Sequence, residues 1–274
     1  MRGTTGNIHA DDDAKRLGFQ GGLVAGSIHM EQLAPLLVRS FGEPWLESGT
    51  ISLYFLTPTL DGEGVRGVIG VPPEGASDAQ VEVWMEKRDG TRICEGTASI
   101  GTPHELSALQ AKALDAYPPG DLRILSKTRA GDDLPVVDTS VDDETLNKRL
   151  TVITEPMSWY TEASRWGGCV PTTVNQVNAL METAYAYLGE RQAPAIGLYG
   201  AIELRNVNGP MLVGRTYRSG GTLRYVGETP KTEYAWFDTW ADDGDKRVVE
   251  MRLMLRFMKA SSPVYEGSGV AADA

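Results

Sequence analysis

Residues 6–27, GNIHADDDAKRLGFQGGLVAGS, place a histidine, a short acidic helix and a glycine-rich turn just ahead of an apolar helix. We expect the apolar helix to begin near Gly26 or Ser27, where its first backbone N–H groups are free and its dipole is positive. Such a helix start suits a developing oxyanion, and His9 is the candidate to move a proton beside it. The stretch therefore indicates a place for a polarised carbonyl next to a base.

The first half of the chain reads as one helix followed by a meander of strands. Residues 27–41 carry apolar side chains at helical spacing, at Met30, Leu33, Ala34, Leu37 and Phe41. We expect four strands after the helix, at residues 50–60, 64–71, 79–87 and 92–101, with Asp89-Gly90 turning the last pair. This order predicts an α+β unit whose antiparallel sheet can wrap around the helix.

The second half repeats this plan, which indicates an internal duplication. A helix is expected at 172–188, and strands are expected at 200–206, 215–226, 233–240 and 247–259. Residues 151–164 are expected to form a strand and a short helix that lead into the second unit's site region. We divide the chain into a first unit at 1–103, a linker at 104–130, a second unit at 131–260 and a frayed tail at 261–274.

The order of residues in 6–27 resembles that of the MaoC-like acyl dehydratases and the related R-specific enoyl-CoA hydratases. Their pattern is an Asn/Ile-His segment, then Ala-x-x-x-Gly-Phe, then an apolar turn that ends in Gly. The match is best over the first 60 residues of this chain. The resemblance implies a tandem, or double, hotdog fold, in which the two units join their sheets into one continuous antiparallel sheet and each cradles a long helix. It also implies that one or both clefts between the units survive.

The same resemblance implies the roles of two residues. His9 matches the family's general acid/base, and Gly26 matches the glycine whose N–H binds the thioester carbonyl. The family's aspartate partner lies five residues before the histidine, where this chain has Thr4. Asn7 or an acidic residue of the following helix would then orient the His9 ring, and Asp11 is the acidic residue we favour for this catalytic role.

Further residues are candidates for substrate binding. Ser27 starts the long helix, and His29 shares a helical face with Leu33, so it either lines the tunnel or is a hydrogen-bonded core histidine. The second unit has no histidine at the matching positions. Its candidate lining groups are Trp159, Tyr160, Glu162, Trp166, Asn175 and Asn178. We favour Tyr160, Glu162 and Trp166 for substrate binding, and the first two of these could supply the missing acid or base across the interface.

Composition narrows the class of protein. The chain has 274 residues, a net charge of -11 and two cysteines, and these values favour a reducing compartment and disfavour a nucleic-acid surface. No apolar run is long enough to span a bilayer, and the start does not read as a signal peptide, so we expect a cytoplasmic location. No phosphate loop, dinucleotide fingerprint, Gly-x-Ser-x-Gly elbow or zinc motif is present, so no cofactor and no metal are expected. An anionic substrate would need a local basic patch, for which Lys15, Arg16 and Arg39 are candidates, although each also fits a solvated helix face.

The expected function is that of a lyase that adds or removes water at an α,β-unsaturated or β-hydroxy acyl thioester carried by CoA or an acyl carrier protein. The alternatives are an isomerase, a cyclase or another elimination enzyme of specialised metabolism, and a non-catalytic acyl-binding protein. Hydrophobic sheet edges favour a homodimer.

Overall fold

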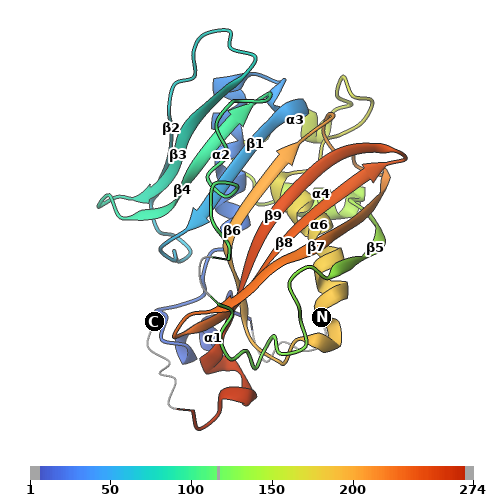
Figure 1. Ribbon diagram of the computed structural model, residues 1–274. Helices are drawn as coiled ribbons and strands as arrows, with labels where there is room; N and C mark the ends of the chain where they lie inside the picture. Colours follow the sequence, from blue (N-terminus) through green and yellow to red (C-terminus); the bar gives the residue numbers. More distant parts are fainter. Residues whose placement is uncertain (1–6, 116–117, 269–274) are drawn as a thin grey trace.

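A computed structural model describes residues 7–115 and 118–268. Its strands form one antiparallel sheet of nine, in the order β2-β3-β4-β1-β6-β9-β8-β7-β5 (Figure 1). The strands are β1 (Gly49–Phe55), β2 (Val65–Ile69), β3 (Ala79–Lys87), β4 (Arg92–Ile100), β5 (Asp133–Ser140), β6 (Gly197–Asn206), β7 (Thr216–Glu228), β8 (Thr232–Asp243) and β9 (Lys246–Met258). The α+β prediction of two helix-plus-meander units within one sheet is confirmed.

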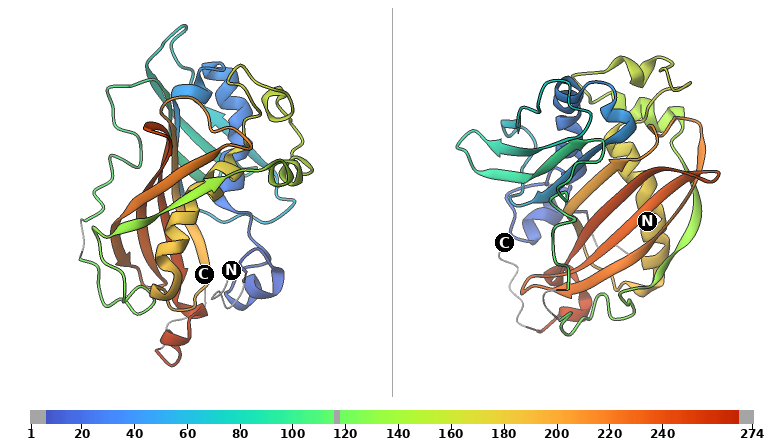
Figure 2. Two further views of the ribbon diagram at one scale, coloured as in Figure 1. Left: turned by 90° about the vertical axis from the view of Figure 1, so that its right-hand side faces the viewer. Right: turned by 45° about the horizontal axis from the view of Figure 1, so that its top comes forward.

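Two long helices, α2 (Gly26–Phe41) and α6 (Thr173–Leu188), cover the same face of the sheet, which we call the inner face (Figure 2). α2 buries Met30, Leu33 and Leu37 against this face because they recur every three or four residues. The buried side chains of both helices and of the central strands form one continuous core. Each fully buried leucine in it contributes about 2 kcal/mol of hydrophobic stabilisation.

The two halves are joined by β1 and β6. Residues Thr50 to Tyr54 of β1 pair with Arg205 to Ala201 of β6, and the ladder stops there. β6 continues back to Gly197 paired with β9, while β1 runs on to Phe55 paired with β4. The sheet is therefore continuous in its middle and split between β1 and β6 at one end.

The segment expected as a linker packs against the other, outer face of the sheet (Figure 1). The Leu109 N–H donates to Ser52 Oγ at 3.0 Å, and the Leu109 side chain is fully buried beside Met254. Gln110 Nε2 donates to Glu203 Oε1 at 2.8 Å. These contacts tie the segment to strands of both units, so it acts as a strap across their junction.

Short helices complete the described chain: α1 (Asp11–Arg16), α3 (Trp45–Ser48), α4 (Asp143–Leu150), α5 (Ser158–Thr161), η1 (Gly189–Arg191), η2 (Lys259–Ser261) and η3 (Pro263–Tyr265). The strand expected within 151–164 is wrong: the residues before α5 form turns and bends, and Pro156 has no N–H to donate to a ladder. The helix α4 was not predicted, although Asp142 caps it through the Thr145 N–H at 2.8 Å.

The part of the expected tail that the structure describes ends at Ser268, and residues 269–274 lie outside the described residues. Within it, the Tyr265 hydroxyl donates to Glu233 Oε1 at 2.7 Å, which fastens η3 to β8. Among the described residues, no helix is long and apolar enough to cross a membrane.

Candidate functional site

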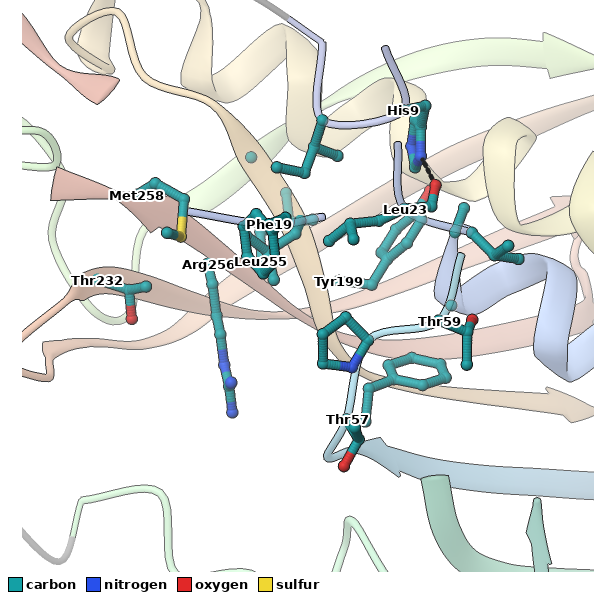
Figure 3. Close-up of a pocket in the computed structure, with 18 of the residues that line it drawn as sticks. His9, Phe19, Leu23, Thr57, Thr59, Tyr199, Thr232, Leu255, Arg256 and Met258 are labelled. Atoms are coloured by element: carbon teal, nitrogen blue, oxygen red, sulfur yellow. Dashed lines mark hydrogen bonds between the residues drawn. The ribbon is translucent and has the colours of Figure 1, made fainter. Parts of the chain in front are cut away.

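A cavity of about 990 Å³ opens at the end of the sheet where β1 and β6 part (Figure 3). Its walls come from the turns around α1, the first turn of α2, the end of β1, the start of β6, the β7–β8 turn and the end of β9. The lining includes Asn7, His9, Phe19, Leu23, Gly26, His29, Phe55, Leu56, Thr57, Thr59, Tyr185, Tyr199, Lys231, Leu255, Arg256 and Met258. Apolar atoms make up most of the cavity surface, so the cavity suits an organic chain with a few polar contacts.

His9 is held at the cavity wall by its own turn. Its backbone N–H donates to Asn7 Oδ1 at 3.1 Å, and its ring Nδ1 lies 2.5 Å from the Leu23 carbonyl oxygen (Figure 3). Because a carbonyl oxygen only accepts hydrogen bonds, Nδ1 carries the proton in the neutral ring and Nε2 carries the lone pair. Nε2 has no hydrogen-bond partner among residues 7–115 and 118–268, so it is available as a base.

The Asp11 carboxylate supports this turn and does not contact the His9 ring. Its Oδ1 accepts the Gly22 N–H at 2.8 Å. A Cβ on Gly22 would lie 2.3 Å from the His9 carbonyl oxygen, so only glycine fits this close approach. Asp11 does not line the cavity, and the ring orientation expected from it is provided by the Leu23 carbonyl.

The first turn of α2 presents backbone donors to the same cavity. Gly26 is the first residue of the helix, and Ala25 at the N-cap offers no side-chain acceptor. A Cβ on Gly26 would lie 2.6 Å from the Phe55 ring, which leaves no room for a larger residue. The positive end of the helix dipole is therefore uncapped at Gly26, and this residue lines the cavity.

Ser27 is buried beside that helix start. Tyr199, on β6, was missed by the sequence reasoning, although it lines the cavity. Burial raises the pKa of its phenol, so the group stays protonated, and its hydroxyl donates to Met181 Sδ at 3.0 Å. The structure marks this position by a register shift after Tyr199 in the β6–β9 ladder. The sequence contains no pattern that would have predicted this shift.

His29 lines the cavity but has partners on both ring nitrogens. Nε2 lies 2.6 Å from Thr59 Oγ1, and Nδ1 lies 3.1 Å from Gln32 Oε1. Burial lowers the pKa of His29, so the ring is neutral near pH 7. The sequence left open whether His29 lines the tunnel or is a hydrogen-bonded core histidine. In the structure it lines the cavity and is hydrogen-bonded as well.

The second cleft, at the N-terminus of α6, is closed. Its remaining space is about 10 Å³, which holds about one water molecule. Glu31 of α2 occupies the helix start: its Oε1 accepts the Val174 N–H at 3.2 Å, and its Oε2 accepts Arg149 Nε at 2.7 Å. α2 leaves its first N–H groups without a side-chain cap beside a cavity, whereas α6 is capped by Thr172 and by a carboxylate from the other unit.

The three candidate binding residues of the second unit lie away from the large cavity, and the expectation that they line it is wrong. Tyr160 is buried against the closed cleft. The Trp166 Nε1 donates to Glu47 Oε1 at 2.8 Å, and the backbone carbonyl of Glu162 accepts the Cys169 thiol at 3.6 Å. The reason is topological: antiparallel pairing of β1 with β6 puts the start of α6 at the opposite end from the start of α2.

Comparisons with solved structures match almost the whole chain. A MaoC-like dehydratase aligns over 90% of this chain and 88% of its own, with a TM-score of 0.56 and 14% identity. A protein of Mycobacterium tuberculosis described as having a double hotdog fold covers 90% of this chain and 86% of its own, with a TM-score of 0.58 and 12% identity. This chain has the double hotdog fold.

A third similar structure is that of a MaoC domain protein dehydratase from Chloroflexus aurantiacus J-10-fl, which covers 92% of this chain and 87% of its own, with a TM-score of 0.58 and 10% identity. No family model and no curated protein matches the sequence. At such identities the likeness establishes the fold, and the chemistry must be argued from the site itself.

Proposed function

We propose that this double hotdog protein binds an acyl thioester in the large cavity and adds water to, or removes it from, the carbons next to the carbonyl. The observation that carries the proposal is that an uncapped helix start and a carbonyl-held imidazole line the same cavity. The Gly26 N–H would hold the thioester oxygen, and His9 Nε2 would move the proton.

In the hydration direction, the water oxygen bonds to the β-carbon while His9 Nε2 takes one of its protons. The electron pair of the double bond moves toward the carbonyl, and the enolate oxygen is stabilised by the Gly26 N–H and the α2 dipole. The imidazolium then returns the proton to the α-carbon. Elimination of water is the reverse sequence, and His9 alone carries the proton in both directions.

The Leu23 carbonyl orients the ring without adding a negative charge. An aspartate at this position would do both, because it would also stabilise the imidazolium. Thr4, at the position of the family's aspartate, lies outside the described residues. The neutral Tyr199 phenol, which donates to Met181 Sδ in this structure, would turn its proton to the substrate oxygen as a further donor.

A second function is favoured by one specific observation: among the described residues, no carboxylate contacts the His9 ring. A neutral base held by a carbonyl suits a proton transfer within the substrate, as in an isomerase. The same residues would act, with His9 removing a proton from one carbon and returning it to another, and the product would have the mass of the substrate.

The test is turnover of trans-enoyl thioesters from four to about twelve carbons, followed by the loss of the enoyl ultraviolet absorbance and by product mass. The lyase proposal expects a product heavier by one water, and activity that His9→Ala removes. A product of unchanged mass would establish the isomerase instead. If folded wild-type protein converted none of these compounds, the lyase proposal would be refuted.

A further inference from the structure

The large cavity has an unusual charge balance for this chain. Its charged lining consists of Lys87, Lys231, Arg256 and Glu63. Lys87 is neutralised by Glu63, with Nζ 3.0 Å from Oε2. Lys231 and Arg256 take part in no ion pair within residues 7–115 and 118–268. In a protein of net charge -11, two cavity-lining cations without a carboxylate partner are available to an anionic ligand.

Arg256 is fixed in position by Tyr54. Its Nη2 donates to the Tyr54 hydroxyl at 2.6 Å, and its guanidinium carbon lies 5.3 Å from the centre of the Tyr54 ring. Lys112, on the strap, places its Nζ 4.5 Å from the same ring centre. Two cations thus gather at one aromatic side chain, and in the described part of the chain no carboxylate pairs with either. A phosphate would relieve their mutual repulsion.

These cations lie away from the proposed chemistry. Arg256 and Met254 point to one side of β9, and Met254 packs under the strap on the outer face. Leu255 and Phe257 point to the inner face, toward α6. Figure 3 shows the Arg256 side chain directed away from His9. The cavity therefore connects the inner face to the outer face at the place where the β1–β6 ladder has ended.

The basic residues that the sequence analysis singled out do not serve this purpose. Lys15, Arg16 and Arg39 pair with carboxylates of Asp11, Asp13 and Glu155, and their side chains are largely exposed. They form a solvated surface, as the alternative interpretation held, and none of them lines the cavity.

We propose that Arg256, Lys112 and Lys231 bind the phosphate group at the far end of a pantetheine arm whose thioester lies at Gly26. The identity of this arm rests on the proposed function. The shared chemistry is a phosphate ester on pantetheine, which occurs in CoA and in the prosthetic group of an acyl carrier protein. The split between β1 and β6 would admit the arm from the outer face.

The test is calorimetric binding of pantetheine, 4′-phosphopantetheine and CoA, which needs no turnover. The proposal expects 4′-phosphopantetheine to bind at least about 10-fold more tightly than pantetheine, with an advantage that shrinks as salt rises. Arg256→Gln removes this advantage, and Arg256→Lys, which keeps the charge, retains part of it. Lys87→Gln is the matched control, because this lysine lines the same cavity but is already neutralised, and it leaves the advantage unchanged.

Equal affinity for pantetheine and 4′-phosphopantetheine would overturn the proposal, as would an Arg256→Gln variant of native stability that keeps the phosphate advantage. Tighter binding of CoA than of 4′-phosphopantetheine would identify CoA as the source, whereas equal binding would favour a carrier protein. Tighter binding of the phosphorylated compound without turnover of any thioester would support the phosphate site and refute the lyase proposal. The failure of one proposal can therefore be told from the failure of the other.

Discussion

The Nδ1 atom of His9 lies 2.5 Å from the carbonyl oxygen of Leu23. The Leu23 N–H in turn donates to the carbonyl oxygen of Ile8, the residue before His9, at 3.0 Å. The turn that carries the histidine is thereby bonded to the turn that leads into α2. Since α2 begins three residues after Leu23, the ring and the helix start are held relative to each other by backbone. This arrangement fixes the imidazole tautomer without a carboxylate.

Replacing His9 by alanine removes the proposed proton carrier. We expect kcat for enoyl thioester hydration to fall about 1,000-fold, the scale of general acid–base catalysis, while the thermal midpoint changes little because the side chain is exposed. His9→Gln, which can still donate to the Leu23 carbonyl, is the control for the shape of the turn and should be equally inactive. Activity within a few-fold of wild type in both variants would exclude His9 as the base.

Gly26→Ala tests the helix start, but its Cβ would collide with the Phe55 ring. We therefore compare Phe55→Leu with the double variant Gly26→Ala/Phe55→Leu, so that the space for the methyl group is the same in both. The double variant keeps the backbone N–H of residue 26 but places a methyl group beside it. We expect it to lose about 100-fold in kcat against Phe55→Leu, because the methyl group keeps the thioester oxygen away from that N–H. Equal kcat in the two proteins would show that the carbonyl binds elsewhere.

Tyr199→Phe removes a protonated phenol beside the helix start. We expect kcat to fall about 10-fold, the effect of one hydrogen bond to a developing charge. Tyr185→Phe is the matched control, because its phenol lines the same cavity from α6, and it should leave kcat unchanged. If Tyr185→Phe lowered kcat and Tyr199→Phe did not, Tyr185 would be the donor instead.

The buried His29 should make the protein less stable in mild acid. Burial lowers the pKa of His29 below its ordinary value of 6.5, so the unfolded chain binds the proton more readily than the native state. Stability is then complete above this value and declines as the pH falls through it. The urea midpoint of wild type should drop between about pH 7.5 and about pH 5.5 by more than that of His29→Gln. Parallel curves for the two proteins would contradict this assignment.

Glu31→Ala should destabilise the protein by about 3 kcal/mol, because it leaves Arg149 without its partner and uncovers the start of α6. The control is Glu155→Ala, which breaks an exposed pair with Arg39 and should cost less than about 1 kcal/mol. Urea unfolding of both variants measures the difference. Similar small losses would mean that the closed second cleft does not depend on Glu31.

Much of the fold could be predicted because each element has a local signal. The Asp89-Gly90 and Asp243-Gly244 turns fix two hairpins, and both glycines have the positive φ that such turns require. Helical spacing located α2 to within one residue of its start. By contrast, the strap could not be predicted, because Leu109 is buried by strands of both units that lie far from it in the sequence.

The candidate site could be predicted in part for the same reason. His9 and Gly26 lie 17 residues apart in one continuous stretch with a recognisable order. Tyr199 and Arg256 reach the cavity because β6 pairs with β1 and β9. No local sequence pattern predicts this pairing. The second-unit candidates failed because the sequence does not show which end of the β1–β6 pair remains open.

A crystal structure with an unreactive ketone analogue of a 3-hydroxyacyl thioester, in which a methylene group separates the carbonyl from the sulfur, tests the central claim most directly. The account predicts the analogue's carbonyl oxygen within about 3 Å of the Gly26 nitrogen, with His9 Nε2 facing the α- and β-carbons. An analogue bound with its carbonyl away from the start of α2, or with the His9 ring turned from the chain, would contradict it.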